Sequence, residues 1–267
     1  MSVLERNNVT VIGSGAKAMV FAHGFGCDQS MWKYVAPAFE RDYTVVLYDL
    51  TGAGRSDLSA YDFDAYGDLV EHGRDLTRIC DALELDRPIV VGHSVSGITA
   101  ALAAKADPDR FDRLVMVSPS PCFLNDGDYQ GGFDRDDLQP IVDFMQENYL
   151  GWAEQLAPTI AGQQADGAAA QMLTQSFCRT DPEIARHFGR TTFMSDRRAD
   201  MKGVTTPTLI IQCSDDAIAP VSVGKWMQQA IPDAVLAEID AVGHCPHMTT
   251  PDTVIAEIRS FLGAGTT

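Results

Sequence analysis

The sequence predicts an α/β fold built on a mostly parallel sheet with helices on both faces. Short apolar runs rich in Val and Ile alternate with stretches of helical periodicity along the chain. The run at residues 43–48 lacks polar alternation, which is typical of a strand buried on both faces. This alternation of strand-like and helix-like stretches stops after residue 119 and resumes at residue 208. This alternation favours a parallel sheet whose faces are covered by helices, with an insertion before its last strands.

The expected strands are short apolar runs bounded by polar or turn-forming residues. β-branched residues dominate most of them, which favours extended backbone over helix. In chain order they are residues 8–12, 19–22, 43–48, 88–91, 113–117, 208–212 and 234–239.

Helical patterns follow most of these strands. The stretch 66–83 carries Leu69, Leu76 and Ile79 at helical spacing. The stretch 95–105 consists mainly of small residues and comes directly after a strand. Two further helices are expected at residues 221–230 and 252–262, after the last two strands. Each helix therefore has a neighbouring strand to pack against.

The interruption, residues 120–200, contains no convincing strand. Helix-like stretches separated by Gly and Pro fill it, at 138–149, 152–160, 168–177 and 182–193. A segment of about 80 residues is too long for an ordinary loop and too well patterned for a linker. We therefore expect residues 1–119 and 201–267 to form one core, with residues 120–200 as a helical insertion over one edge of the sheet.

Composition excludes several classes of function. The chain has 267 residues, with 20 Lys and Arg against 37 Asp and Glu, a formal net charge of −17. Such a surface repels phosphate backbones and anionic lipids, so we expect no nucleic-acid partner. No run of about eighteen apolar residues is present, and no signal peptide is recognisable, so we expect no membrane association. The six cysteines are scattered without a CxxC pair, which favours a cytoplasmic protein with reduced thiols.

The stretch GHSVSG, residues 92–97, directly follows an expected strand and offers two hydroxyls. A strand that turns sharply into a helix at Gly-x-Ser-x-Gly presents a nucleophilic serine, and the tight turn tolerates only small residues two positions to either side. Ser94 meets this rule, since Gly92 and Ser96 flank it. Ser96 does not, because Ile98 is too bulky. We therefore expect Ser94 to be the nucleophile.

A serine hydroxyl needs a base, and the base needs an orienting acid. In this arrangement the chain order is serine, acid, histidine. The sequence TLIIQCSDDAIAP supplies two acids after a strand. Asp216 is the expected acid because Pro220 follows four residues later, as is common in such acid loops. Asp215 is expected to cap a turn or to face solvent.

The sequence DAVGHCPHM supplies two histidines after the last strand. His244 is the expected base because Gly243 permits a close turn toward the serine. His247 is expected to pack or to form a hydrogen bond. A metal site at these histidines and Cys245 lacks a fourth ligand, so we expect neither a metal nor an organic cofactor.

Acyl transfer also needs two donors for the developing oxyanion. The backbone N–H of Val95, at the start of the expected helix, is one. The segment VFAHGFGCDQ follows an early strand, and its two glycines, Gly24 and Gly26, flank Phe25. We therefore expect the backbone N–H of Phe25 to be the second donor.

Several longer stretches show a resemblance that covers residues 8–262. They are HGFGCDQSMW, YDLTGAGRSDL, GHSVSG, SPSPCFLNDGDYQGGF, YLGWA and GHCPHM. Together they resemble the α/β-hydrolase branch that holds the bacterial stress-signalling regulator RsbQ and the plant strigolactone and karrikin receptors. The resemblance implies an α/β-hydrolase fold in which residues 120–200 form a helical lid over an apolar pocket. Beyond Phe25 and Val95, it implies a pocket wall of His93, Phe123, Phe133, Trp152, Leu156 and Phe193. Phe177 and Phe188 are expected to be lid packing.

The resemblance also implies a function, with alternatives. Aromatic walls suit a small hydrophobic ester or lactone, so the first expectation is a serine hydrolase. The second is a slow hydrolase that senses its ligand and binds a phosphatase-type protein partner. The third is a cofactor-free peroxidase or a C–C bond hydrolase with the same three residues. Cys245 and Leu156 depart from the plant receptors, which carry Leu and Phe at these positions, and this favours the bacterial regulator type.

Overall fold

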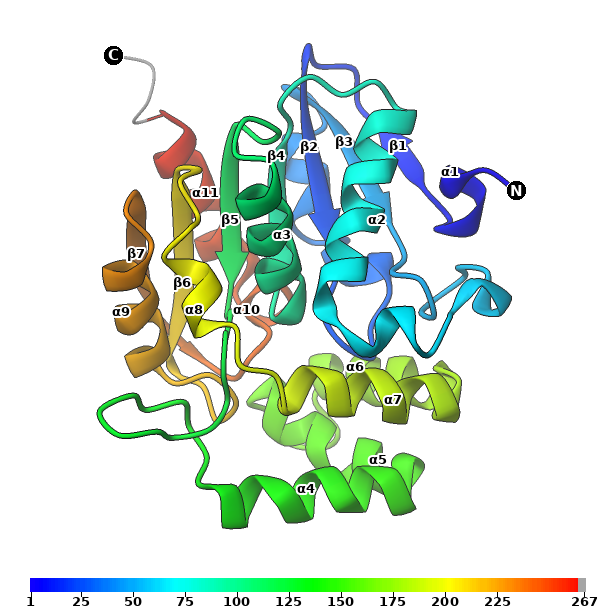
Figure 1. The fold of residues 1–267 in the computed structure, drawn as a ribbon, viewed down its shortest axis with the longest axis vertical. Helices are drawn as coiled ribbons and strands as arrows, with labels where there is room; N and C mark the ends of the chain where they lie inside the picture. Colours follow the sequence, from blue (N-terminus) through cyan, green and yellow to red (C-terminus); the bar gives the residue numbers. More distant parts are fainter. Residues whose placement is uncertain (264–267) are drawn as a thin grey trace.

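A computed structural model describes residues 1–263, and its centre is a seven-stranded sheet (Figure 1). The strand order is β1-β3-β2-β4-β5-β6-β7, and only the β1–β3 pair is antiparallel. The strands are β1 (Thr10–Ile12), β2 (Lys17–Ala22), β3 (Tyr43–Tyr48), β4 (Ile89–His93), β5 (Arg113–Val117), β6 (Thr208–Asp215) and β7 (Ala234–Val242). The expected α/β class with a mostly parallel sheet is confirmed.

The predicted first strand begins too early. It was expected from residue 8, but β1 starts at Thr10. Asn8 has a φ of 46°, which is outside the extended region, and its side-chain amide donates to Asp49 at 2.8 Å. The left-handed backbone at Asn8 therefore delays the strand.

Helices cover both faces of the sheet. On one face lie α2 (Leu69–Ala82), α3 (Val95–Ala106) and α9 (Val221–Ala230). The other face carries α11 (Pro251–Gly263) and the short 3-10 helices η1 (Gln29–Trp32) and η2 (Ala36–Phe39). The remaining short elements are α1 (Val3–Arg6), η3 (Leu58–Ala60), η4 (Ala65–Gly67), α8 (Arg198–Met201) and α10 (Pro246–Thr249).

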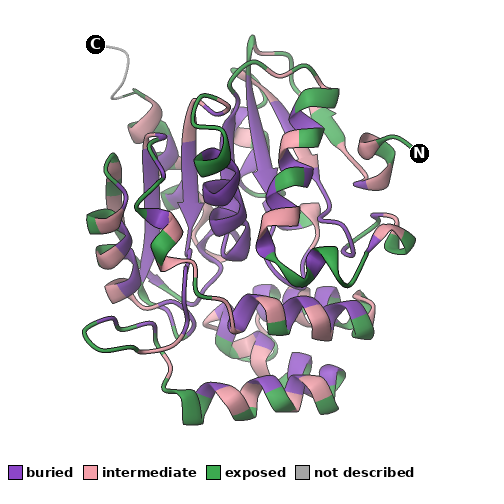
Figure 2. Ribbon diagram, in the orientation of Figure 1, coloured by how far each residue is buried: buried purple, intermediate pink, exposed green. Residues whose placement is uncertain are grey.

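Alternate residues of the central strands enter two separate apolar clusters. In β4, Val90 belongs to the cluster under α2 and α3, whereas Ile89 and Val91 belong to the cluster under α11. Side chains of a strand point alternately to the two faces of its sheet. Because both faces are apolar, a strand of this kind reads as a continuous apolar run. Figure 2 shows the central strands and α3 as almost entirely buried.

Four long helices lie between β5 and the short helix α8 in the chain, beside the carboxyl ends of the strands (Figure 1). We call them the cap helices: α4 (Arg135–Glu147), α5 (Tyr149–Ala161), α6 (Ala168–Arg179) and α7 (Pro182–Phe193). Each matches one of the helix-like stretches expected in the insertion. Their apolar side chains join the cluster under α2 and α3, so one apolar core continues from the sheet into the cap.

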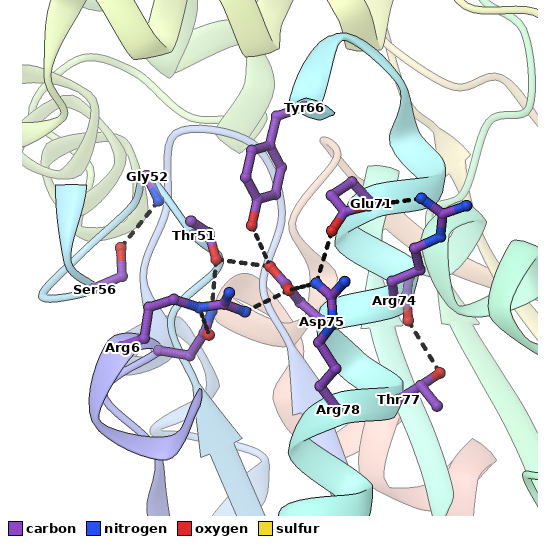
Figure 3. A network of polar contacts seen from close by, with 12 residues as sticks. Arg6, Thr51, Gly52, Ser56, Tyr66, Glu71, Arg74, Asp75, Thr77 and Arg78 are labelled. Atoms are coloured by element: carbon purple, nitrogen blue, oxygen red, sulfur yellow. Dashed lines mark hydrogen bonds and ion pairs between the residues drawn. The ribbon is translucent and has the colours of Figure 1, made fainter. Parts of the chain in front are cut away.

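A buried carboxylate ties the start of the chain to α2 (Figure 3). Asp75 accepts hydrogen bonds from the hydroxyls of Tyr66 at 2.6 Å and Thr51 at 2.7 Å. It also pairs with Arg6 and, at 2.9 Å, with Arg78. Burial by itself raises the pKa of Asp75, but the two hydroxyl donors and the charge of Arg6 outweigh it, so the pKa of this carboxyl lies below its usual value.

We expect Asp75→Asn to lower the free energy of unfolding by about 2–3 kcal/mol at pH 7, because Arg6 loses its buried charge partner. A lowered folded-state pKa means that the stabilisation is fully present above the unfolded value, about 4, and is lost as the pH falls through the folded value. The difference in the free energy of unfolding between wild type and Asp75→Asn should therefore become smaller below about pH 4. Urea denaturation at several pH values measures it.

Asp81→Asn is the matched control on α2. Its carboxylate is 65% exposed and pairs with Arg110, and exposed pairs contribute little. Equal stability of Asp75→Asn and wild type at pH 7 would contradict the role given to this network.

Candidate active site

Ser94 occupies a strained turn between β4 and α3. Its φ is 53° and its ψ is −123°, a conformation that non-glycine residues rarely adopt. The turn brings backbones so close that a Cβ on Gly92 would lie 2.6 Å from the carbonyl carbon and oxygen of Ser96. This contact is the physical reason why a glycine precedes the serine by two positions.

The second hydroxyl of the motif is used elsewhere. Ser96 is fully buried, and its Oγ donates to the backbone carbonyl of His23. It therefore ties the start of α3 to the end of β2. Ser94 is the hydroxyl that meets the histidine.

The ring of His244 bridges Ser94 and Asp216. Its Nε2 lies 2.8 Å from Ser94 Oγ, and its Nδ1 lies 2.7 Å from Asp216 Oδ2. An ionised carboxylate only accepts hydrogen bonds, so the proton belongs on Nδ1, and Nε2 is free to accept from the serine hydroxyl. All three side chains are buried.

The acid is held by its own loop. Asp216 Oδ1 accepts from the backbone N–H groups of Ile218 at 2.8 Å and Ala219 at 3.1 Å. These bonds orient the carboxylate so that Oδ2 faces His244. Asp215 is exposed, and its carbonyl accepts from the N–H of Gly243 at 2.7 Å, which holds the acid loop against the histidine loop.

The histidine loop packs directly on cap helix α5. Gly243 has a φ of +93°, and a Cβ there would lie 2.5 Å from the carbonyl carbon of Ala161. Gly162 ends α5 in a left-handed conformation and faces the same loop. The backbone N–H of His244 donates to the carbonyl of Ile160 at 2.7 Å. The position of the candidate base therefore depends on the cap.

Two further histidines, His93 and His247, lie next to His244. His93 Nε2 donates to the carbonyl of His244 at 2.9 Å, and burial holds the pKa of His93 well below its usual value, so the ring is neutral. His247 is fully buried between the rings of Trp32, at 4.6 Å, and His93, at 4.3 Å. Burial lowers the pKa of His247 to about 3, so it packs as a neutral ring.

The expected oxyanion donors belong to two elements next to Ser94. Val95 is the first residue of α3. Residues 24–27 form a turn closed by the N–H of Cys27, which donates to the carbonyl of Gly24 at 3.3 Å, with Gly26 at a φ of +69°. A Cβ on Gly24 would lie 3.4 Å from Ser94 Cβ. The backbone that leads into Phe25 therefore runs beside the serine.

Ser94 opens into a small apolar cavity under the cap. Its volume is about 30 Å³, room for about two water molecules. Of the expected residues, Phe25, His93, Phe123, Trp152 and Phe193 line it together with Ser94 and His244. The sequence did not predict the remaining lining residues, which are Cys27, Ile160, Leu173, Phe177, Thr192, Ile218 and Cys245.

The structure corrects three expectations about this wall. Phe133 does not line the cavity, because it lies in a loop whose backbone pairs with Phe123, and it is Phe123 that faces inward. Leu156 is likewise absent from the wall and stays partly exposed on α5, where Trp152 lines the cavity instead. Phe177 was expected to be lid packing, yet it lines the cavity.

Phe188, in contrast, is not part of the cavity wall. Its ring packs 5.7 Å from that of Phe25 and 4.5 Å from that of His72, where α7 meets α2. This agrees with its expected packing role. A larger groove of about 660 Å³ lies between η1 and α6, but its walls include charged residues and contain none of Ser94, Asp216 and His244. The small cavity is therefore the candidate site, since the serine lines it.

Within residues 1–263, no three His, Cys, Asp or Glu side chains gather in a way that could hold a metal ion. The described helices include none that is long and apolar enough to cross a membrane. All six cysteines are free thiols, five of them buried.

A serine, a histidine and an acid at the carboxyl ends of parallel strands define a hydrolase-type site. Residues 19–257 match the alpha/beta hydrolase family, and the chain belongs to that family. The Karrikin insensitive 2 receptor IA of Petunia hybrida is 40% identical to it, over 92% of this chain and 90% of the receptor.

Strigolactone esterase D14 of Arabidopsis thaliana is 35% identical, over 98% of this chain and 96% of the esterase. Among solved structures, a hydrolase from Oleispira antarctica superimposes with a TM-score of 0.94 at 40% identity, over 98% of this chain and 96% of that one. The similarity therefore includes the cap helices as well as the sheet.

We expect Gly243→Ala to lower the rate of ester hydrolysis at least tenfold and to lower the melting temperature. The new Cβ would meet backbone atoms of α5, which cannot move without shifting either the cap or His244. Steady-state kinetics and thermal unfolding measure the two effects.

Gly127→Ala is the matched control, because Gly127 also has a positive φ, +57°, but open space around it. Gly127→Ala should lower the free energy of unfolding only by the backbone strain, about 1 kcal/mol. Its rate of ester hydrolysis should equal that of wild type. Equal rates for the two variants would show that the contact between α5 and the histidine loop does not position the base.

Proposed function

We propose that this protein is a serine hydrolase of small hydrophobic esters or lactones that works through an acyl-enzyme on Ser94. The observation that carries the proposal is the ring of His244, which contacts Ser94 Oγ and Asp216 Oδ2 at the same time. This arrangement can take a proton from the serine and stabilise the resulting imidazolium.

In the proposed reaction, Ser94 Oγ attacks the carbonyl carbon while its proton moves to Nε2 of His244. Asp216 stabilises the charged ring and remains ionised. The backbone N–H groups of Phe25 and Val95 receive the oxyanion. The imidazolium then protonates the leaving alkoxide, and His244 next activates a water that releases the acid and restores Ser94.

The cavity wall supports a hydrophobic substrate. Phe25 lies at its centre, with the rings of Trp152, Phe177 and Phe193 about 6 Å away. The volume of about 30 Å³ fits only a very small acyl group when the cap is seated. A larger ligand must therefore displace the cap helices, and residues 120–200 act as a lid in this proposal.

Cap displacement is also a route to signalling. Relatives of this chain are named as karrikin receptors and strigolactone esterases. The N–H of His244 is bonded to the carbonyl of Ile160 in α5, so the occupancy of the site and the position of the cap are linked. We extend the proposal to slow turnover and a phosphatase-type protein partner that recognises the cap, in the cytoplasm.

We expect a fluorophosphonate or a p-nitrophenyl ester to label Ser94 and no other hydroxyl. Peptide mass spectrometry of the wild type locates the adduct. Ser94→Ala should lose the label and at least 10³-fold in hydrolysis. Ser96→Ala is the control, and it should still be labelled at Ser94. Label on Ser96, or turnover that survives Ser94→Ala, would refute the proposal.

We expect Phe177→Leu to shift the preference toward longer acyl chains, because a smaller side chain at the wall enlarges the cavity. Rates for p-nitrophenyl acetate, butyrate and hexanoate give the preference. Phe188→Leu also replaces a phenylalanine by leucine, but outside the cavity wall. It should therefore keep the wild-type order of rates for the three esters. An unchanged order in both variants would argue that the cap opens fully before acylation.

A further inference from the structure

Hydrogen bonds hold the carbonyl groups of Gly24 and Phe25 in the turn at residues 24–27. Leu50 N–H donates to His23 Nε2 at 3.0 Å, so the proton of His23 sits on Nδ1, which donates to the carbonyl of Gly24 at 2.9 Å. The N–H of Cys27 donates to the same oxygen. The thiol of Cys27 donates to the carbonyl of Phe25 at 3.2 Å. The donors to the carbonyls of Gly24 and Phe25 therefore all come from residues 23–27.

The carbonyl of Gly26 is held differently. It accepts from the hydroxyl of Ser176 at 2.9 Å, across 150 positions of the chain. Ser176 is 7% exposed and lies on cap helix α6. Within residues 1–263, the hydrogen-bond donors to the carbonyls of Gly24, Phe25 and Gly26 are His23, Cys27 and Ser176, and Ser176 is the one that belongs to the cap.

The packing around this bond is tight. A Cβ on Gly26 would lie 2.0 Å from Cδ1 of Phe177, the residue after Ser176. The ring of Phe177 in turn lies 6.1 Å from that of Phe25. Helix α6 therefore contacts the turn through one hydrogen bond and the ring of Phe177, next to the backbone expected to bind the oxyanion.

The other hydroxyl of α6 shows what a helical hydroxyl ordinarily does. Thr174 donates to the carbonyl of Ala170, one turn earlier in the same helix, at 2.9 Å, which is the usual local bond. Ser176 instead donates out of its helix to the core. The two hydroxyls make equally short bonds, but only one of them joins the cap to the active-site turn.

We propose that Ser176 is a positioning residue for acyl transfer: its hydroxyl holds the turn 24–27 so that the N–H of Phe25 faces the oxyanion. This inference rests on the proposed function. Ser176 fixes the peptide that joins Gly26 to Cys27, and the N–H of this peptide donates to the carbonyl of Gly24, which shares a peptide with the N–H of Phe25. The alignment of the oxyanion donor therefore depends in part on the seating of α6, and chemistry is coupled to cap closure.

The test compares Ser176→Ala with wild type in acylation by p-nitrophenyl acetate. The rate constant for acylation should fall about tenfold, a fraction of the loss of a complete oxyanion donor, with KM changed less than twofold. A trifluoromethyl ketone forms an adduct with Ser94 that carries an oxyanion, so its Ki should rise by the same factor. Binding of the matching methyl ketone should not change.

Thr174→Ala is the matched control, since it removes a hydroxyl with an equal bond from the same helix. Its rates should equal those of wild type. Ser176→Thr keeps the hydroxyl and should restore acylation to within about twofold of wild type. Thermal unfolding of each variant separates positioning from loss of fold, because the two alanine variants should melt at similar temperatures.

The outcomes separate this inference from the proposed function. A reactive wild type together with a Ser176→Ala variant that acylates as fast as Thr174→Ala would overturn the positioning role and leave the hydrolase intact. Equal weakening of the trifluoromethyl and methyl ketones would also overturn it, since it would indicate damage to the pocket. A wild type that is not acylated at Ser94 would overturn the proposed function, and the inference with it.

Discussion

The two hydrogen bonds of the His244 ring are the interaction on which the site depends, and the parallel sheet makes them possible. Ser94, Asp216 and His244 follow β4, β6 and β7, which end at the same edge of the sheet. Ser94 and His244 are 150 positions apart in the chain, yet Ser94 Oγ and His244 Nε2 lie 2.8 Å apart without long connecting loops. A core that is apolar on both faces keeps these strand ends fixed.

Holding that geometry requires strained backbone and close approaches. Ser94 adopts a positive φ, and Gly92 and Gly243 sit where any side chain would meet backbone. The surrounding structure offsets this strain through burial and hydrogen bonds to the triad loops. The same close approaches bring α5 against the histidine loop and α6 against the turn 24–27. The cap helices thus support the candidate active site as well as covering its cavity.

The sequence predicted the sheet, the four cap helices and the meeting of Ser94, Asp216 and His244, because each leaves a local signal. Apolar runs that alternate with helical stretches along the chain predict the strands, and the small residues around Ser94 predict the tight turn. The prediction failed where the outcome depends on how the cap packs. Phe177 lies against Gly26, and Leu156 stays partly exposed on α5, because of how the helices are placed in space. Ser176 has no motif around it, and only its bond to Gly26 reveals it.

The most direct test of the account is ¹⁵N NMR of histidine-labelled protein at neutral pH, with the His244 signals assigned by a His244→Gln variant. The geometry predicts a His244 ring that carries its proton on Nδ1, bonded to Asp216, and leaves Nε2 open to the serine. A ring protonated on Nε2 instead, or one whose signals are unchanged by Asp216→Asn, would contradict it.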